Sequence, residues 1–212
     1  VARELGDWQR VSWSLHFAAS AQIALHDHER SVRLLRERIE LCREHESLAD
    51  LAISLVMICS EVWLVGGREE AEALLDEGET IAKREGFGTF AGYATYQRGN
   101  LALWSGEHGR AAGLHKEALR AFRDLAYRPG IAHALDCLSY SLGASGCHRA
   151  SMRAAGAAAA LWAGMQQAVS PHDQIEQESY LGPVREALGD EADVLFDEGR
   201  LMPLEELLAS LL

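Results

Sequence analysis

The chain has 212 residues, of which 48% are hydrophobic and 25% are charged, so its length and composition allow a sizeable core. This apolar content excludes a disordered chain, and no uncharged apolar run reaches the roughly 18 residues that a membrane span needs. The formal net charge is −12, and residues 165–212 contribute −9 of it, with 11 acidic and 2 basic residues. Since nucleic-acid binding relies on clustered cations, we expect no direct contact with DNA or RNA.

The first 128 residues contain no proline and are rich in Ala, Leu, Glu and Arg, which predicts one helix after another. Alternating runs rich in Val, Ile and Thr, which would indicate strands, are missing. Turn signals recur every 40 residues, at His26-Asp27, Gly66-Gly67, Gly106-Glu107 and Gly146-Cys147. We therefore expect at least ten helices, no sheet, and helix-to-helix turns over 26–29, 66–69, 106–109 and 146–149.

The same 40-residue shift aligns small residues as well as turns. A first column holds Ala19, Cys59, Gly99 and Ser139; a second, twelve positions later, holds Ser31, Ala71, Ala111 and Ser151. A third column lies seven positions further on at Gly78, Ala118 and Ala158, but Arg38 interrupts it in the first copy. Small residues at these intervals predict helical hairpins whose two backbones approach closely, and stacked neighbours would share one core.

Separations of 12 and 7 between small residues resemble the tetratricopeptide repeat (TPR), and the stretch Gly106–Ala118 resembles the start of that repeat's second helix. The period of 40 exceeds the usual 34, and HEAT or armadillo repeats are the alternative. The resemblance implies an all-α fold: a right-handed superhelical solenoid of about four 40-residue hairpins.

The last part of the chain departs from the repeat. We expect a helix from Pro171 to about Leu188, bent near Gly182-Pro183, followed by short helices over about 190–198 and 203–212. A solenoid needs an end with a polar outer side. The prediction is therefore one solenoid domain, with four hairpins in 1–165 and a degenerate, acidic helical cap in 166–212.

The segment ALGDEADVLFDEGRLMPLEELLASLL, preceded by AAAALWAGM, is similar to the end of the helical-repeat region in large bacterial, especially actinobacterial, regulators. Those regulators are signal-transducing ATPases linked to a LuxR-type or winged-helix DNA-binding domain. The resemblance implies a sensor or oligomerisation arm, with the ATPase and the DNA-binding domain lying outside this chain. The chain begins at Val1 without an initiator Met or a signal segment, so we expect it to be part of a longer protein.

Motifs for chemistry are weak. No GxxxxGK[ST] loop, HExxH pair or CxxC pair occurs, and the four cysteines fit reduced thiols in the cytoplasm. His133, Asp136 and Cys137 have helical spacing, but side chains from one helical turn project in parallel, so a Cys/His enzyme is only a remote alternative. We expect no enzymatic activity, no cofactor and no metal site.

In the TPR arrangement the first helix of each hairpin lines the concave groove. Some of the family's groove positions hold aromatic and hydrogen-bonding residues, most of them in hairpins three and four, and this mixture suits a peptide or a small polar ligand. They are Trp13, His16, Tyr93, Tyr96, Asn100, His133, Asp136 and Tyr140.

The sequence thus predicts a non-enzymatic sensor or protein-interaction module of a transcriptional regulator. Its expected partners are a protein, a peptide or a small-molecule inducer, together with other domains of the same polypeptide. The alternative is a structural arm that self-associates, for example as a homodimer, through its convex face or its C-terminal helix. A second possibility for the groove is that the acidic tail folds back and fills it.

Overall fold

A computed structural model describes residues 7–166 and 171–212 of the chain. Eleven helices and no strands occur in these two ranges, so the all-α prediction is confirmed. The chain divides into two compact units, residues 1–97 and 98–212, and the boundary falls inside helix α5.

The first eight helices all have 17 residues and are joined by three-residue turns. In chain order they are α1 (Trp8–Ala24), α2 (His28–Glu44), α3 (Leu48–Leu64), α4 (Arg68–Arg84), α5 (Gly88–Trp104), α6 (His108–Asp124), α7 (Arg128–Ala144) and α8 (His148–Gly164). The predicted 40-residue register is confirmed, because α2, α4, α6 and α8 all begin within the expected turn ranges.

One turn geometry ends each of these helices. Residues with positive φ recur every 20 positions, at 26, 46, 66, 86, 106, 126, 146 and 166. At Gly66, for example, the amide of Gly66 donates to the Trp63 carbonyl (3.0 Å) and the amide of Gly67 to the Val62 carbonyl (2.9 Å). These two bonds form a Schellman motif, which satisfies carbonyls that a helix end leaves without partners. The sequence marks four of the eight turns with glycine, whereas His26, Glu46, Ala126 and Gln166 adopt the same conformation without it.

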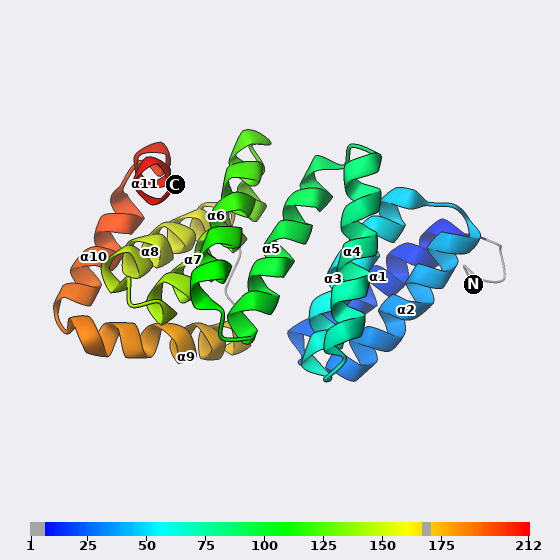
Figure 1. The fold of residues 1–212 in the computed structure, drawn as a ribbon, viewed down its shortest axis with the longest axis horizontal. Coiled ribbons are helices and arrows are strands. Elements are labelled where there is room, and N and C mark those ends of the chain that lie inside the picture. Colours follow the sequence, from blue (N-terminus) through cyan, green and yellow to red (C-terminus); the bar gives the residue numbers. More distant parts are fainter. Residues whose placement is uncertain (1–6, 167–170) are drawn as a thin grey trace. The chain divides into compact units, whose positions relative to one another are not determined.

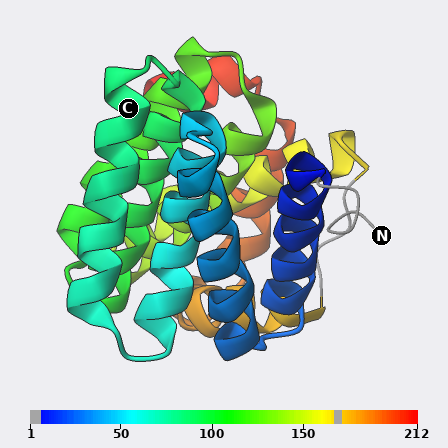
Figure 2. The same ribbon diagram turned by 90° about the vertical axis from the view of Figure 1, so that its right-hand side faces the viewer.

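In the first unit, successive helices pack in chain order, α1 on α2, α2 on α3 and α3 on α4. Figure 2 shows α1 and α2 side by side and antiparallel. The small columns explain this packing, since Ala19, Cys59, Ser31 and Ala71 are all fully buried where helices meet. Burial at these positions supports the predicted alignment of the hairpins.

The second unit continues the pattern with α6 on α7 and α7 on α8, and then departs from it. Its last helices are α9 (Pro171–Leu188), α10 (Glu191–Leu201) and α11 (Leu204–Leu211), close to the predicted ranges (Figure 1). Pro183 lies inside α9. The expectation of a single domain stays a prediction.

Helix α10 packs closely along α8, because each of the two helices has a glycine at the point where they cross. A Cβ atom at Gly156 would collide with the backbone carbonyl of Phe196, and one at Gly199 would collide with the carbonyl of Arg153. Ion pairs Arg149–Glu191 and Arg153–Glu198 flank the crossing. The apolar side of α11 packs against the rest of the chain, since Leu207, Leu208 and Leu211 are buried.

Candidate functional site

Charge is distributed unequally between the two helices of each hairpin. The four first helices (α1, α3, α5 and α7) contain six Asp, Glu, Lys or Arg residues, whereas the four second helices (α2, α4, α6 and α8) contain 26. In the first unit, second helices are joined by ion pairs such as Arg36–Glu70 (2.7 Å) and Arg43–Glu77 (2.9 Å). The first helices therefore offer nearly uncharged surfaces, on which apolar contacts can contribute to binding.

Helix α1 exposes two large aromatic side chains, Trp13 at 52% and Phe17 at 65%. Their rings stack, with centroids 5.9 Å apart and an interplanar angle of 27°. The ring of His16 lies edge-on to both, with centroids 5.8 Å from Trp13 and 5.5 Å from Phe17. We call these three residues the α1 aromatic surface. Exposed aromatic clusters of this kind are typical of interaction sites.

A buried polar network lies directly beneath this surface. Arg38 on α2 is 1% exposed, and its guanidinium reaches three neighbours: Ser12 Oγ at 3.2 Å, His16 Nδ1 at 3.2 Å and Asp50 Oδ1 at 2.8 Å. Ser47 holds the second oxygen of Asp50 at 2.9 Å. The network joins α1, α2 and α3, and the carboxylate neutralises a charge that would be costly to bury alone.

Burial and the charges of this network both act on the pKa of His16. Burial, followed by the positive charge of Arg38, lowers the pKa of His16 below its usual value, while Asp50 acts in the opposite direction. A proton on Nδ1 would also point at a guanidinium. His16 is therefore neutral at physiological pH.

Tyr93 and Tyr96, the other predicted groove residues of the first unit, lie on the part of α5 that precedes the unit boundary. Both are half-buried, and their rings pack edge-to-face with centroids 6.2 Å apart. One turn of helix separates them, so they form a local pair.

In the second unit, Trp162 of α8 packs on two of the predicted groove residues. Its indole Nε1 donates to Asp136 Oδ2 at 2.6 Å, and its ring lies edge-on to His133 with centroids 4.7 Å apart. All three side chains are half-buried. The carboxylate of Asp136 therefore accepts a hydrogen bond from an indole on the neighbouring helix, and this contact holds the two helices together.

Asn100 belongs to the core of the second unit. Its side-chain oxygen lies 3.1 Å from Nε2 of His115, whose Nδ1 lies 2.8 Å from Ser141 Oγ. His115 is fully buried, and burial lowers its pKa to about 3, so the ring is neutral. A Cβ atom at Gly99 would collide with this ring, which explains why the first small column has glycine there.

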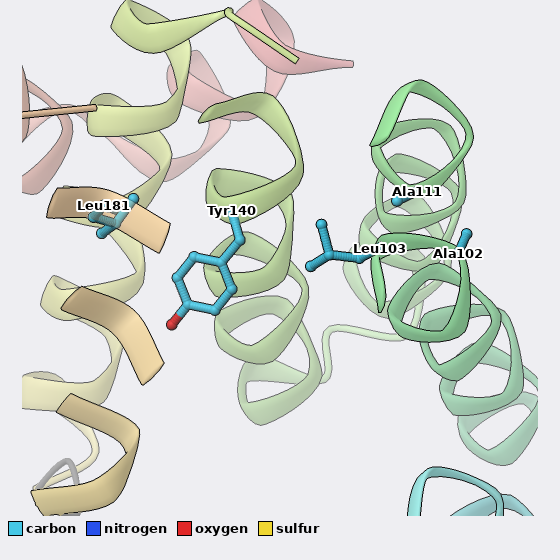
Figure 3. Packing of buried hydrophobic residues seen from close by; sticks show 6 residues of the cluster. Ala102, Leu103, Ala111, Tyr140 and Leu181 are labelled. Carbon is cyan, nitrogen blue, oxygen red and sulfur yellow. The ribbon is translucent and has the colours of Figure 1, made fainter. Parts of the chain in front are cut away.

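Tyr140 is also buried, at 8% exposure, because α9 covers it. Its ring stacks on Tyr180 with centroids 4.9 Å apart and an interplanar angle of 9°. The Tyr180 hydroxyl accepts a hydrogen bond from the Trp104 indole. Figure 3 shows Tyr140 pointing toward the segment that carries Leu181, with Leu103 on the other side of α7. A partner could reach Tyr140 only if α9 moved.

Sequence reasoning predicted Trp13 and His16 but missed Phe17, Arg38, His115, Trp162 and Tyr180. Arg38 had a usable signal, since it alone interrupts the third small column. His115 had a similar one, because Leu35, Leu75 and Ala155 hold its place in the other hairpins. Trp162 and Tyr180 had none, because their roles depend on contacts between helices.

In residues 7–166 and 171–212, no group of three or more His, Cys, Asp and Glu side chains is arranged to hold a metal ion. None of the helices in those ranges combines the length and the hydropathy of a membrane span.

Comparisons with known proteins support the fold. No family model matches the chain, and no curated protein matches it. Among solved structures, the chain is similar to a kinesin light chain-like protein from Podosopora anserina with nearly identical TPR-like repeats. The match has a TM-score of 0.57 and 16% sequence identity, and it covers 93% of this chain and 94% of the other. The chain therefore has a TPR-like helical-repeat fold.

Proposed function

We propose that the chain is a non-enzymatic protein-interaction module that binds a neutral, apolar segment of a partner protein at the α1 aromatic surface. The observation that carries the proposal is the stacked pair of Trp13 and Phe17, exposed on a helix whose only charged residue is Arg10. Arg10 is itself paired with Asp7 at 2.9 Å. A charged partner would lose hydration here without gaining a counter-charge, whereas an apolar partner gains burial of two aromatic rings.

The TPR-like fold adds a second line of support, because repeat scaffolds present extended surfaces built from equivalent helix positions. The other predicted groove residues support binding less directly. Asn100 and Tyr140 are buried, while His133 and Asp136 pack with Trp162. Their part in a groove shared with Tyr93 and Tyr96 stays a prediction.

We further propose that this module is the sensor arm of a cytoplasmic bacterial transcriptional regulator, with a peptide or a small-molecule inducer as its ligand. It rests on the resemblance of residues 157–165 and 187–212 to the regulators described above. The complete gene would test it, since an ATPase and a DNA-binding domain should be encoded with this segment.

The self-association alternative gains no support from the C-terminal helix. The leucines of α11 that could form a dimer seam are buried within the chain, and Arg120 donates to the carbonyl of Leu212 at 2.6 Å. Light scattering over a concentration series would decide, because a self-associating arm has to show a concentration-dependent mass.

Peptide selection tests the proposed binding mode. A phage-displayed library of random peptides is selected on the full chain, and enriched peptides are measured against Trp13→Ala/Phe17→Ala. We expect enriched peptides to be poor in charged residues and to bind this variant at least tenfold more weakly. The matched control is Val194→Ala/Leu201→Ala, which removes two exposed apolar side chains from α10 and should leave binding unchanged.

Charged consensus peptides, or peptides that bind the α1 variant and the wild type equally, would refute the proposal.

A further inference from the structure

The first hairpin contains a feature that the other hairpins lack. The third small column has Gly78, Ala118 and Ala158 in hairpins two to four, but Arg38 in hairpin one. All four positions are buried. Since three of the four hairpins have a small residue at this position, the fold does not require a buried guanidinium here. Arg38 is therefore a candidate for a role at the surface above it.

The hydrogen bond between Arg38 and His16 fixes where the imidazole proton lies. Arg38 Nη1 is 3.2 Å from His16 Nδ1, and a guanidinium can donate but cannot accept. His16 Nδ1 must therefore accept, and the single proton of the neutral ring lies on Nε2. The charged groups around His16 are the guanidinium of Arg38, on α2, and the carboxylate of Asp50, on α3, joined to each other at 2.8 Å.

Nε2 of His16 is left available on the protein surface. Within the described residues, the only hydrogen bond of the His16 ring is the one at Nδ1, and the ring is half-buried. Trp13 and Phe17 stand on either side of position 16 along α1 and contact the ring edge-on. The α1 aromatic surface thus combines two exposed apolar rings with one hydrogen-bond donor of fixed tautomer.

We infer that Arg38 holds His16 as an Nε2–H donor, and that the α1 aromatic surface takes a neutral segment with an apolar side chain and a carbonyl acceptor beside it. This inference rests on the proposed function and adds the chemistry of the partner. Charge complementarity selects the neutral partner. A carboxylate would find no unpaired cation here, because Arg10 on α1 is paired with Asp7 and Arg38 on α2 is paired with Asp50. A cationic partner would meet a donor instead of an acceptor. His16 binds the partner, and Arg38 is a positioning residue.

The tautomer is measured first, by long-range ¹H–¹⁵N NMR of the histidine rings in the full chain near pH 7. We expect His16 to carry its proton on Nε2 and to have an unprotonated Nδ1. In Arg38→Met the two tautomers should both be populated, because the fixed donor is gone. A wild-type His16 that is charged, or protonated on Nδ1, overturns the inference.

The partner's chemistry is tested with two small probes, N-acetylphenylalaninamide and 2-phenylethylammonium. The first is neutral and has carbonyl acceptors; the second has the same ring, a positive charge and no acceptor. We expect only the neutral amide, at millimolar concentration, to shift the His16 Nε2–H and Trp13 Nε1–H resonances. Absence of any shift at His16 overturns the inference, as does equal binding of both probes.

Variants at position 16 separate a hydrogen bond from packing. His16→Leu should weaken amide binding about three- to tenfold, the usual effect of one neutral hydrogen bond. His16→Gln keeps a side-chain N–H donor and should retain most of the affinity. Unchanged binding in His16→Leu would refute this inference while the proposed function stands. If His16 has the expected tautomer but selected peptides ignore Trp13 and Phe17, the proposed function fails instead.

Discussion

Each unit buries one arginine or histidine side chain among its helices, and the hydrogen bonds of these two side chains differ. In the first unit Arg38 replaces a small residue and holds Ser12, His16 and Asp50, and one histidine nitrogen remains free for contacts outside the unit. In the second unit His115 replaces a leucine, and both of its nitrogens are used inside the core, by Ser141 and Asn100.

The aromatic residues on the first helices show the same difference. Trp13 and Phe17 are exposed on α1, whereas Tyr140 on α7 is stacked beneath α9. Equivalent repeat positions therefore acquire different roles depending on whether another helix covers them. We therefore expect a binding surface on a first helix whose aromatic side chains no other helix of its unit covers. At such a surface the buried polar network can leave one hydrogen-bonding group for a partner.

The largest expected effect concerns the α8–α10 crossing, which has no counterpart in the first unit. Gly156→Ala should destabilise the second unit by about 3 kcal/mol or more, because the new methyl group collides with backbone atoms of α10 that cannot rotate away. Thermal and denaturant unfolding measure the loss. Gly113→Ala is the control, since a methyl group there meets no atom within 4 Å and should stabilise α6 by about 0.5–1 kcal/mol. Equal stability of both variants would mean that the crossing is looser than described.

The next effect tests the network of the first unit. Arg38→Met should cost about 2–3 kcal/mol, because Asp50 and Ser12 lose their common donor. A double-mutant cycle with Asp50→Asn measures the coupling, which we expect to be about 1–2 kcal/mol. Additive effects of the two substitutions would show that the buried ion pair does not act as a unit.

The third effect concerns pH and His115. The folded state keeps this ring neutral with a pKa of about 3, whereas the unfolded chain has the ordinary value of 6.5. Protons therefore bind the unfolded state preferentially below pH 6.5, and stability present above that pH is lost as pH falls toward 3. The loss should reach about 2 kcal/mol at pH 5.

Denaturant unfolding between pH 7 and 5 measures this loss, and His115→Gln should remove most of it. A smaller loss should persist in that variant, because the pKa of His16 is lowered as well. The same pH dependence in the wild type and in His115→Gln would contradict a buried neutral histidine.

The smallest expected effect on stability is that of Trp13→Ala. An exposed aromatic side chain contributes little to folding, so the unfolding free energy should change by no more than about 0.5 kcal/mol. Tyr140→Ala provides the contrast, since truncation of a buried, stacked ring should cost about 3 kcal/mol or more. Similar losses for the two variants would remove the distinction between an open and a covered aromatic surface.

Much of the fold follows from local sequence signals. Proline-free, alanine-rich segments form helices by propensity, and small residues at fixed spacing show where helices approach. The register, four inter-helix turns and the bounds of the last three helices could therefore be predicted within a few residues. The same reasoning found Trp13 and His16, because the repeat register places them on the first helix.

Other features could not be read from the sequence. A tyrosine on a first helix reads as a groove residue whether or not a later helix stacks on it, so the covering of Tyr140 by Tyr180 became visible only in the folded chain. In the same way, Asn100 looks like a polar groove residue until His115 is found behind it.

The sequence by itself determined the all-α repeat, its 40-residue period and the separation of charge between first and second helices, because these depend on residues close together in the chain. Only the tertiary structure decided which aromatic rings are open, which nitrogen of His16 carries the proton, and that Arg38 is buried. The reason is physical: exposure and protonation depend on what several helices bring to one point, and residues 12, 16, 38 and 50 meet only after three helices have packed.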